Sequence, residues 1–137
     1  MTSSQLRERF RAARTDPALA VLEGLHPLKH ALRFGAEPLE VVSPDPDRLL
    51  ALARALAPDL TARLGELVRP LGAELFAALA PSVPSSPVLA LARRPTITLD
   101  DALAHAPAAP AVVLEDPTHA GNIGAVVRVA AAAGAAA

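Results

Sequence analysis

The sequence predicts an α/β fold with a small sheet. Short aliphatic runs that suit strands alternate with longer segments in which leucine and alanine repeat at helical spacing. This alternation favours a layered fold in which helices cover a sheet. Of the 137 residues, 52% are hydrophobic, but three are phenylalanine and none is tryptophan or tyrosine. We therefore expect a core of leucine and valine, which contribute about 1.5–3 kcal/mol per buried side chain.

Residues 1–95 are expected to form the first domain. Its opening helix is capped by Ser3-Ser4 and runs to about Arg14, and the following Thr15-Asp16-Pro17 stops it because proline disfavours helix at the residue before it. Asp47 is expected to cap a later helix, and Gly35 to end an earlier one. The complete expectation is strands at 18–22, 39–42 and 88–92, with helices at 3–14, 27–34, 47–57, 60–71 and 74–79.

The charge balance argues against a generally basic nucleic-acid-binding protein. Thirteen lysines and arginines face 14 aspartates and glutamates, for a net charge of −1, whereas domains that bind nucleic acids are usually basic. Positive charge does gather near the N-terminus, where Arg7, Arg11 and Arg14 are expected to share one face of the first helix. This strip is a candidate contact for RNA phosphates, with a solvated helix face as the alternative interpretation.

Several other classes of protein are not expected. The chain has no cysteine, so it has neither disulfides nor thiolate metal sites. Charged residues soon follow the N-terminus, which does not suit a signal peptide, and Arg128 interrupts the apolar segment 123–137. His26 and His30 are four residues apart but lack a third ligand for zinc. We expect a soluble, cytoplasmic protein with no metal and no membrane partner.

The C-terminal part holds the pattern most informative about function. A linker is expected over 96–110, with a short helix from about 99 to 105. A βα unit is expected over 111–137, in which a strand at 112–114 is followed by a helix. The strand ends in Glu115-Asp116-Pro117, an ordinary turn sequence.

The helix that follows is expected to open on Asn122 as its N-cap. Gly121 and Gly124 leave this end of the helix free of side chains, and Arg128 falls on the same face. Free N–H groups and the helix dipole favour anions at such a position. The pattern therefore suits a phosphate or a ribose.

These residues resemble a known family motif. Asp116-Pro117, followed by Asn122-x-Gly124-Ala125-x-x-Arg128-x-Ala130 and Gly134, is similar to the first motif of the SpoU/TrmH family. Its members are S-adenosylmethionine-dependent RNA ribose 2′-O-methyltransferases. Here residues 118–121 separate the proline from the asparagine, where the family usually has one residue, so the loop is longer.

A second similarity lies upstream, at residues 21–36. Glu23-Gly24 after a short strand, and Ala31-Leu32 before Gly35, resemble the start of the substrate-binding domain that precedes the catalytic domain in many members. That domain usually has a ribosomal-protein-L30-like α/β/α fold. The resemblance thus implies an L30-like RNA substrate-binding domain at 1–95, a linker at 96–110, and at 111–137 the first βα unit of a trefoil-knot methyltransferase domain.

The resemblance also implies roles and partners. It makes Arg128 and Asn122 the catalytic candidates, and it adds Gly121 and Gly124 to the arginine strip as substrate-binding candidates, with rRNA or tRNA as the partner. The two further motifs that tie the knot and hold S-adenosylmethionine are not present in the sequence, so no cofactor-binding residue is expected here. We expect this chain alone to be inactive, and the full-length parent to be a homodimer.

Two other functions stay open at this point. One is a non-catalytic RNA-binding module of the L30 type, against which the weak basicity counts. The other is a Rossmann-type nucleotide-binding protein, since a strand, a glycine-bearing turn and a helix occur together. Gly121-Asn122-Ile123-Gly124 lacks the G-x-G-x-x-G spacing that close approach to a pyrophosphate requires.

Overall fold

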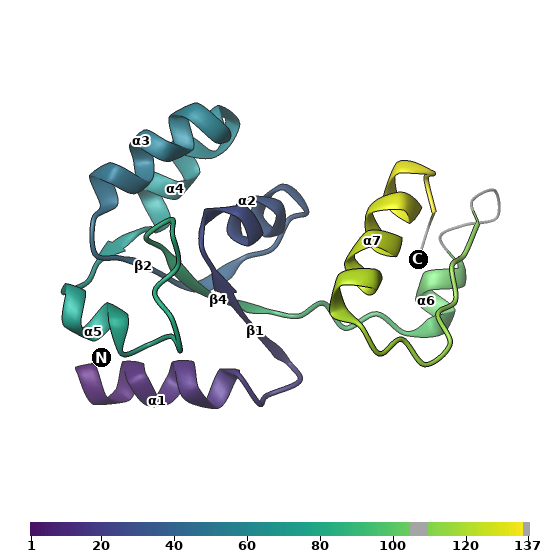
Figure 1. Cartoon of the computed structure of the whole chain (residues 1–137), viewed down its shortest axis with the longest axis horizontal. Helices are drawn as coiled ribbons and strands as arrows, with labels where there is room; N and C mark the ends of the chain where they lie inside the picture. Colours follow the sequence, from purple (N-terminus) through teal and green to yellow (C-terminus); the bar gives the residue numbers. More distant parts are fainter. Residues whose placement is uncertain (105–109, 136–137) are drawn as a thin grey trace. The chain divides into compact units, whose positions relative to one another are not determined.

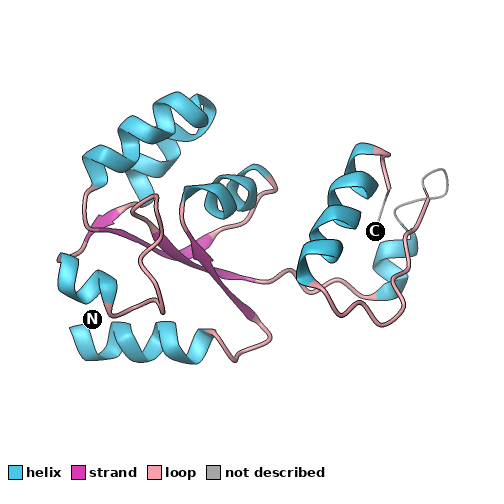
Figure 2. Cartoon of the chain, viewed as in Figure 1, coloured by secondary structure: helices cyan, strands magenta, loops and turns pink. Residues whose placement is uncertain are grey.

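The structure is a computed structural model that describes residues 1–104 and 110–135. The chain divides into two compact units, Met1–Pro95 and Thr96–Ala137. The first unit combines a mixed four-stranded sheet with helices, which confirms the predicted α/β class (Figure 2). Each unit is described below by itself.

The sheet of the first unit has the strand order β1-β4-β2-β3. Strands β1 (Leu19–Glu23) and β2 (Pro38–Ser43) both pair antiparallel with β4 (Leu89–Arg93), which lies between them. The fourth strand, β3 (Arg69–Pro70), pairs parallel with the end of β2 and was not expected from the sequence. It replaces the end of the helix predicted at 60–71.

Helices cover both faces of this sheet (Figure 1). Along the central strand, Leu89 and Leu91 pack on one face with α1 (Ser3–Ala13) and α5 (Ala73–Ala77). Val88, just before β4, and Ala90 pack on the other face with the remaining helices. These are α2 (Leu25–Arg33), α3 (Pro46–Leu56) and α4 (Thr61–Leu67), with the 3₁₀ turn η1 (Pro58–Leu60) between the last two. Alternate residues of a strand point to opposite faces, so one strand serves two cores.

Two helix caps differ from those expected. Thr2, rather than Ser3 or Ser4, caps α1: its hydroxyl accepts from the Gln5 N–H at 3.2 Å, and the Gln5 side chain accepts from the Thr2 N–H at 2.7 Å. Asp45, rather than Asp47, caps α3 by accepting from the Arg48 N–H at 2.9 Å. Pro46 then occupies the first helical turn, where its missing N–H costs nothing.

The described part of the second unit contains two helices, α6 (Leu99–Ala104) and α7 (Ala120–Ala132). The strand expected at 112–114 is not formed, and the Val113 side chain is 89% exposed. The physical reason is that a strand needs a neighbour for its backbone hydrogen bonds, and the described residues of this unit provide none. Residues 105–109, inside the expected linker, lie outside the described residues.

Candidate functional site

The start of α7 carries the residues of the family-like motif. The helix begins at Ala120, with His119 in the N-cap position and no side-chain capping bond. Asn122 is therefore the third helical residue, and its backbone N–H donates to the His119 carbonyl at 3.0 Å. The predicted Asn122 N-cap is wrong, because the longer loop supplies Ala120 and Gly121, which extend the helix toward its N-terminus.

One face of α7 is open over its first two turns. A Cβ added to Gly121 or Gly124 would meet no other atom within 4 Å. Asn122 and Arg128 are exposed, and the Arg128 guanidinium makes no hydrogen bond or ion pair with another described residue. The helix thus presents an unshielded guanidinium beside bare backbone, which leaves room for a sugar-phosphate group to approach.

The described residues of this unit do not fit S-adenosylmethionine. Its hollows of about 230 and 380 Å³ are lined by aliphatic side chains and proline only, among them Val112, Leu114 and Val126. Such a lining offers no side-chain partner for an adenine, a ribose hydroxyl or a sulfonium charge.

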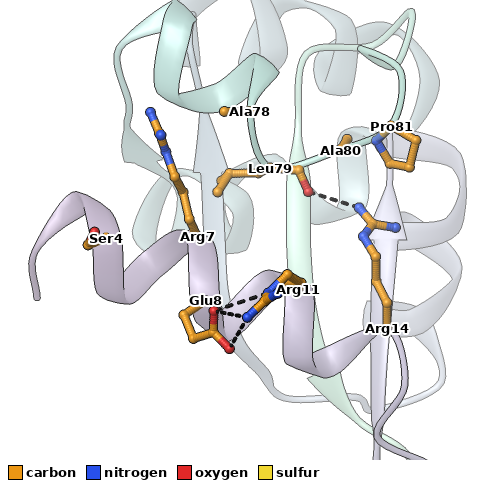
Figure 3. Close-up of a pocket in the computed structure, with 9 residues that line it drawn as sticks. All are labelled: Ser4, Arg7, Glu8, Arg11, Arg14, Ala78, Leu79, Ala80 and Pro81. Carbon is orange, nitrogen blue, oxygen red and sulfur yellow. Dashed lines mark hydrogen bonds and ion pairs between the residues drawn. The ribbon is translucent and has the colours of Figure 1, made fainter.

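The structure brings Arg7, Arg11 and Arg14 together along one side of α1. With the chain that leaves α5, they line a hollow of about 510 Å³ (Figure 3). The opposite wall is formed by residues 78–81, from Ala78 to Pro81. The arginines therefore border a concave surface rather than a plain helix face.

Two of these three arginines are already paired. Arg11 donates to the Glu8 carboxylate at 2.7 Å, and Arg14 donates to Glu23 at 2.6 Å and to the Leu79 carbonyl at 2.9 Å. Arg7 has no such contact with a described residue. Because exposed pairs such as Arg11–Glu8 contribute about 1 kcal/mol or less, an incoming phosphate can displace Glu8, whereas Arg14 joins α1 to two other segments. Arg7 and Arg11 are the phosphate-binding candidates of this groove.

Helix α2 carries four basic side chains, of which Arg33 donates to the Asp59 carboxylate at 2.7 Å. The rings of His26 and His30 meet edge to face, with centroids 4.7 Å apart. The pKa of His30 lies below its usual value, first because of partial desolvation and then because His26, Lys29 and Arg33 repel its charged form. Among the described residues, no group of three metal-ligating side chains is placed to hold an ion.

A groove of about 570 Å³ that was not predicted from the sequence lies at the C-terminal end of α2. Phe34, Arg93 and Arg94 line it, together with small residues of β1 and β4. The sequence does contain one indication of this groove. Phe34 comes just before Gly35, which ends the helix, and the neighbouring residues offer its aromatic ring nothing to pack against. The consecutive residues Arg93 and Arg94, however, are brought close to Phe34 only by the pairing of strands in the sheet.

Comparison of the sequence with models of known protein families finds no match, and comparison with curated proteins finds no relative. The family resemblance therefore rests on the motif residues themselves. Within the part of the chain that the structure describes, no helix has the length and apolar character needed to cross a membrane.

Proposed function

We propose that this chain is part of an RNA ribose 2′-O-methyltransferase of the SpoU/TrmH type. In this proposal residues 1–95 are the L30-like domain that binds rRNA or tRNA, residues 96–110 are the linker, and residues 111–137 supply the first segment of the trefoil-knot domain. The observation that carries it is the exposed, unpaired Arg128 on the same face of α7 as Gly121 and Gly124. Helices on both faces of a small mixed sheet support the L30-like part.

Arg128 acts on the substrate by position and charge. A guanidinium stays protonated at any physiological pH, so it does not remove the proton of the 2′-hydroxyl. Its planar fork instead binds a phosphate at two points and holds the neighbouring ribose in one orientation. The bare backbone at Gly121 and Gly124 lets the sugar come close, and Asn122 offers an exposed amide beside it.

The methyl donor and the assembly follow from the resemblance. S-adenosylmethionine is held by motifs that these 137 residues do not contain, and the complete enzyme is a cytoplasmic homodimer. A second candidate function is RNA binding without catalysis, which is favoured by the two arginine-bearing grooves of the first unit.

The test is Arg128→Lys in a protein that joins this chain to the two cofactor-binding motifs. Methyl transfer from labelled S-adenosylmethionine to total RNA should fall by about a hundredfold, because lysine keeps the charge but loses the two-point grip. Cofactor affinity, measured by calorimetry, should not change.

Arg54→Lys is the matched control, since Arg54 is also an exposed helical arginine. It should leave methyl transfer unchanged. Near-normal turnover by Arg128→Lys would show that the arginine has no catalytic role. RNA binding without any methyl transfer by the parent protein would favour the second candidate.

A further inference from the structure

The groove at the C-terminal end of α2 exists because small residues face each other across the sheet. Ala20 of β1 pairs with Ala92 of β4, and both line the groove with Leu22. Helix α2 covers this face of the sheet and stops at Arg33, and the hollow lies where the helix ends, beside the two alanines. The resulting hollow of about 570 Å³ lies within the range of small-ligand sites.

The backbone holds an aromatic ring beside this hollow. Phe34 caps the C-terminus of α2, and its side chain lines the groove although the residue is 83% exposed. The Ala36 N–H donates to the Ala31 carbonyl at 2.9 Å and the Gly35 N–H to the Leu32 carbonyl at 3.1 Å. Together with the φ of +80° at Gly35, these bonds form a Schellman motif, which fixes the backbone at Phe34.

The charges beside the ring favour an anionic ligand with a flat apolar part. Arg93 and Arg94 line the groove at the end of β4. Arg94, two residues after Ala92, follows on the same side of the sheet as the groove, and its Nε donates to the Leu19 carbonyl at 2.8 Å. Arg93 is exposed, and it pairs with Leu19, which packs on the opposite face of the sheet. The carboxylate of Glu37 also lines the groove, so a bare phosphate fits poorly. A nucleobase, by contrast, can donate an N–H to this carboxylate.

We propose that this groove binds one unpaired nucleotide of an RNA, with the base stacked on Phe34 and the backbone phosphate beside Arg94. An exposed aromatic ring next to arginines is the combination that binds single-stranded nucleic acids. A base inside a duplex is already stacked and cannot enter. The inference deepens the proposed function, on which it rests, by assigning single-stranded RNA to a specific site in the first unit.

The chain contains no tryptophan and no tyrosine, so Phe34→Trp introduces a single indole at the groove. Its emission should be quenched when single-stranded octaadenylate is added to the full chain, and should not respond to a guanine–cytosine RNA duplex of equal length. Leu56→Trp is the matched control, because Leu56 is also an exposed apolar residue at the end of a helix. Its emission should not change with either RNA.

Fluorescence anisotropy with labelled octaadenylate then measures affinity. Phe34→Ala should weaken binding about tenfold without changing the salt dependence, whereas Leu56→Ala should bind as the unmodified chain does. Arg94→Gln should reduce the slope of log affinity against log salt by about 0.7, which corresponds to one lost phosphate contact. Arg54→Gln should leave the slope unchanged.

The other outcomes separate this proposal from the proposed function. Equal RNA binding by the unmodified chain and Phe34→Ala, without quenching of Phe34→Trp, would overturn the groove site and leave RNA as the substrate. A change in Phe34→Trp emission with protein concentration alone would mean that a second copy of the chain occupies the groove. Absence of octaadenylate binding would also overturn the site, while the methyl-transfer assay decides the proposed function independently.

Discussion

The two units of this chain differ most in what they bury. In Met1–Pro95, helices on both faces of the sheet enclose two clusters that contain fully buried side chains such as Phe10, Leu28 and Leu91. Among the described residues of Thr96–Ala137 no residue is buried, and Val129 of α7 is 69% exposed. A sheet that offers two faces can build a core from short elements, whereas one helix beside an unpaired segment cannot.

The candidate sites follow the same division. Phe34 and Arg14 are held by backbone bonds and ion pairs of a packed domain. Arg128 is held only by the helix that carries it, and its surroundings include no described partner. The packing of the first unit therefore positions its candidate side chains, whereas in the second unit the position of Arg128 depends on α7 alone.

The largest expected effect tests this contrast in burial. Phe10→Ala should lower the free energy of unfolding by about 3–5 kcal/mol, because it leaves a cavity in the cluster between α1 and the sheet. Val127→Ala, at a residue 58% exposed on α7, should change it by less than about 0.5 kcal/mol. Urea denaturation followed by circular dichroism measures both. Comparable losses in the two variants would mean that α7 is packed in solution.

Replacing one glycine in each unit by alanine should change stability in opposite directions. Gly24→Ala should destabilise the first unit by about 1–3 kcal/mol, because φ is +95° and the new Cβ would lie 2.9 Å from the Ser86 hydroxyl oxygen that accepts from the Leu25 N–H. Gly121→Ala should stabilise α7 by about 0.5–1 kcal/mol, because alanine favours helix and the site is open. Thermal melting checks the first, and helical circular dichroism the second. The same sign for both would contradict the structure.

The smallest effect concerns pH. The folded pKa of His30 lies below the ordinary histidine value of 6.5, so near that pH the unfolded chain binds more protons than the folded chain. Stability should therefore fall as the pH drops through 6.5 toward the folded pKa, and should rise again with pH. His30→Gln should reduce this loss. Urea midpoints at several pH values measure it, and an unchanged pH profile in His30→Gln would contradict the lowered pKa of His30, which partial desolvation and then repulsion from His26, Lys29 and Arg33 cause.

Local sequence determined most elements of the first unit. The aliphatic runs that become β1, β2 and β4 and the helical repeats of α1 to α4 carry their periodicity within a few residues, and Gly35 ends α2 as expected because a positive φ suits glycine. The sequence by itself also indicated the exposed motif on α7, since helical spacing alone places Gly121, Gly124 and Arg128 on one face.

Only the tertiary structure decided the rest, because it depends on partners far along the chain. Arg69-Pro70 has no strand-like pattern and becomes β3 through its pairing with the end of β2. Val112–Leu114 has a strong strand pattern yet forms no strand, since the described residues offer it no neighbour. The groove beside Phe34 likewise depends on Ala20 and Ala92 meeting across the sheet, a register that no local pattern contains.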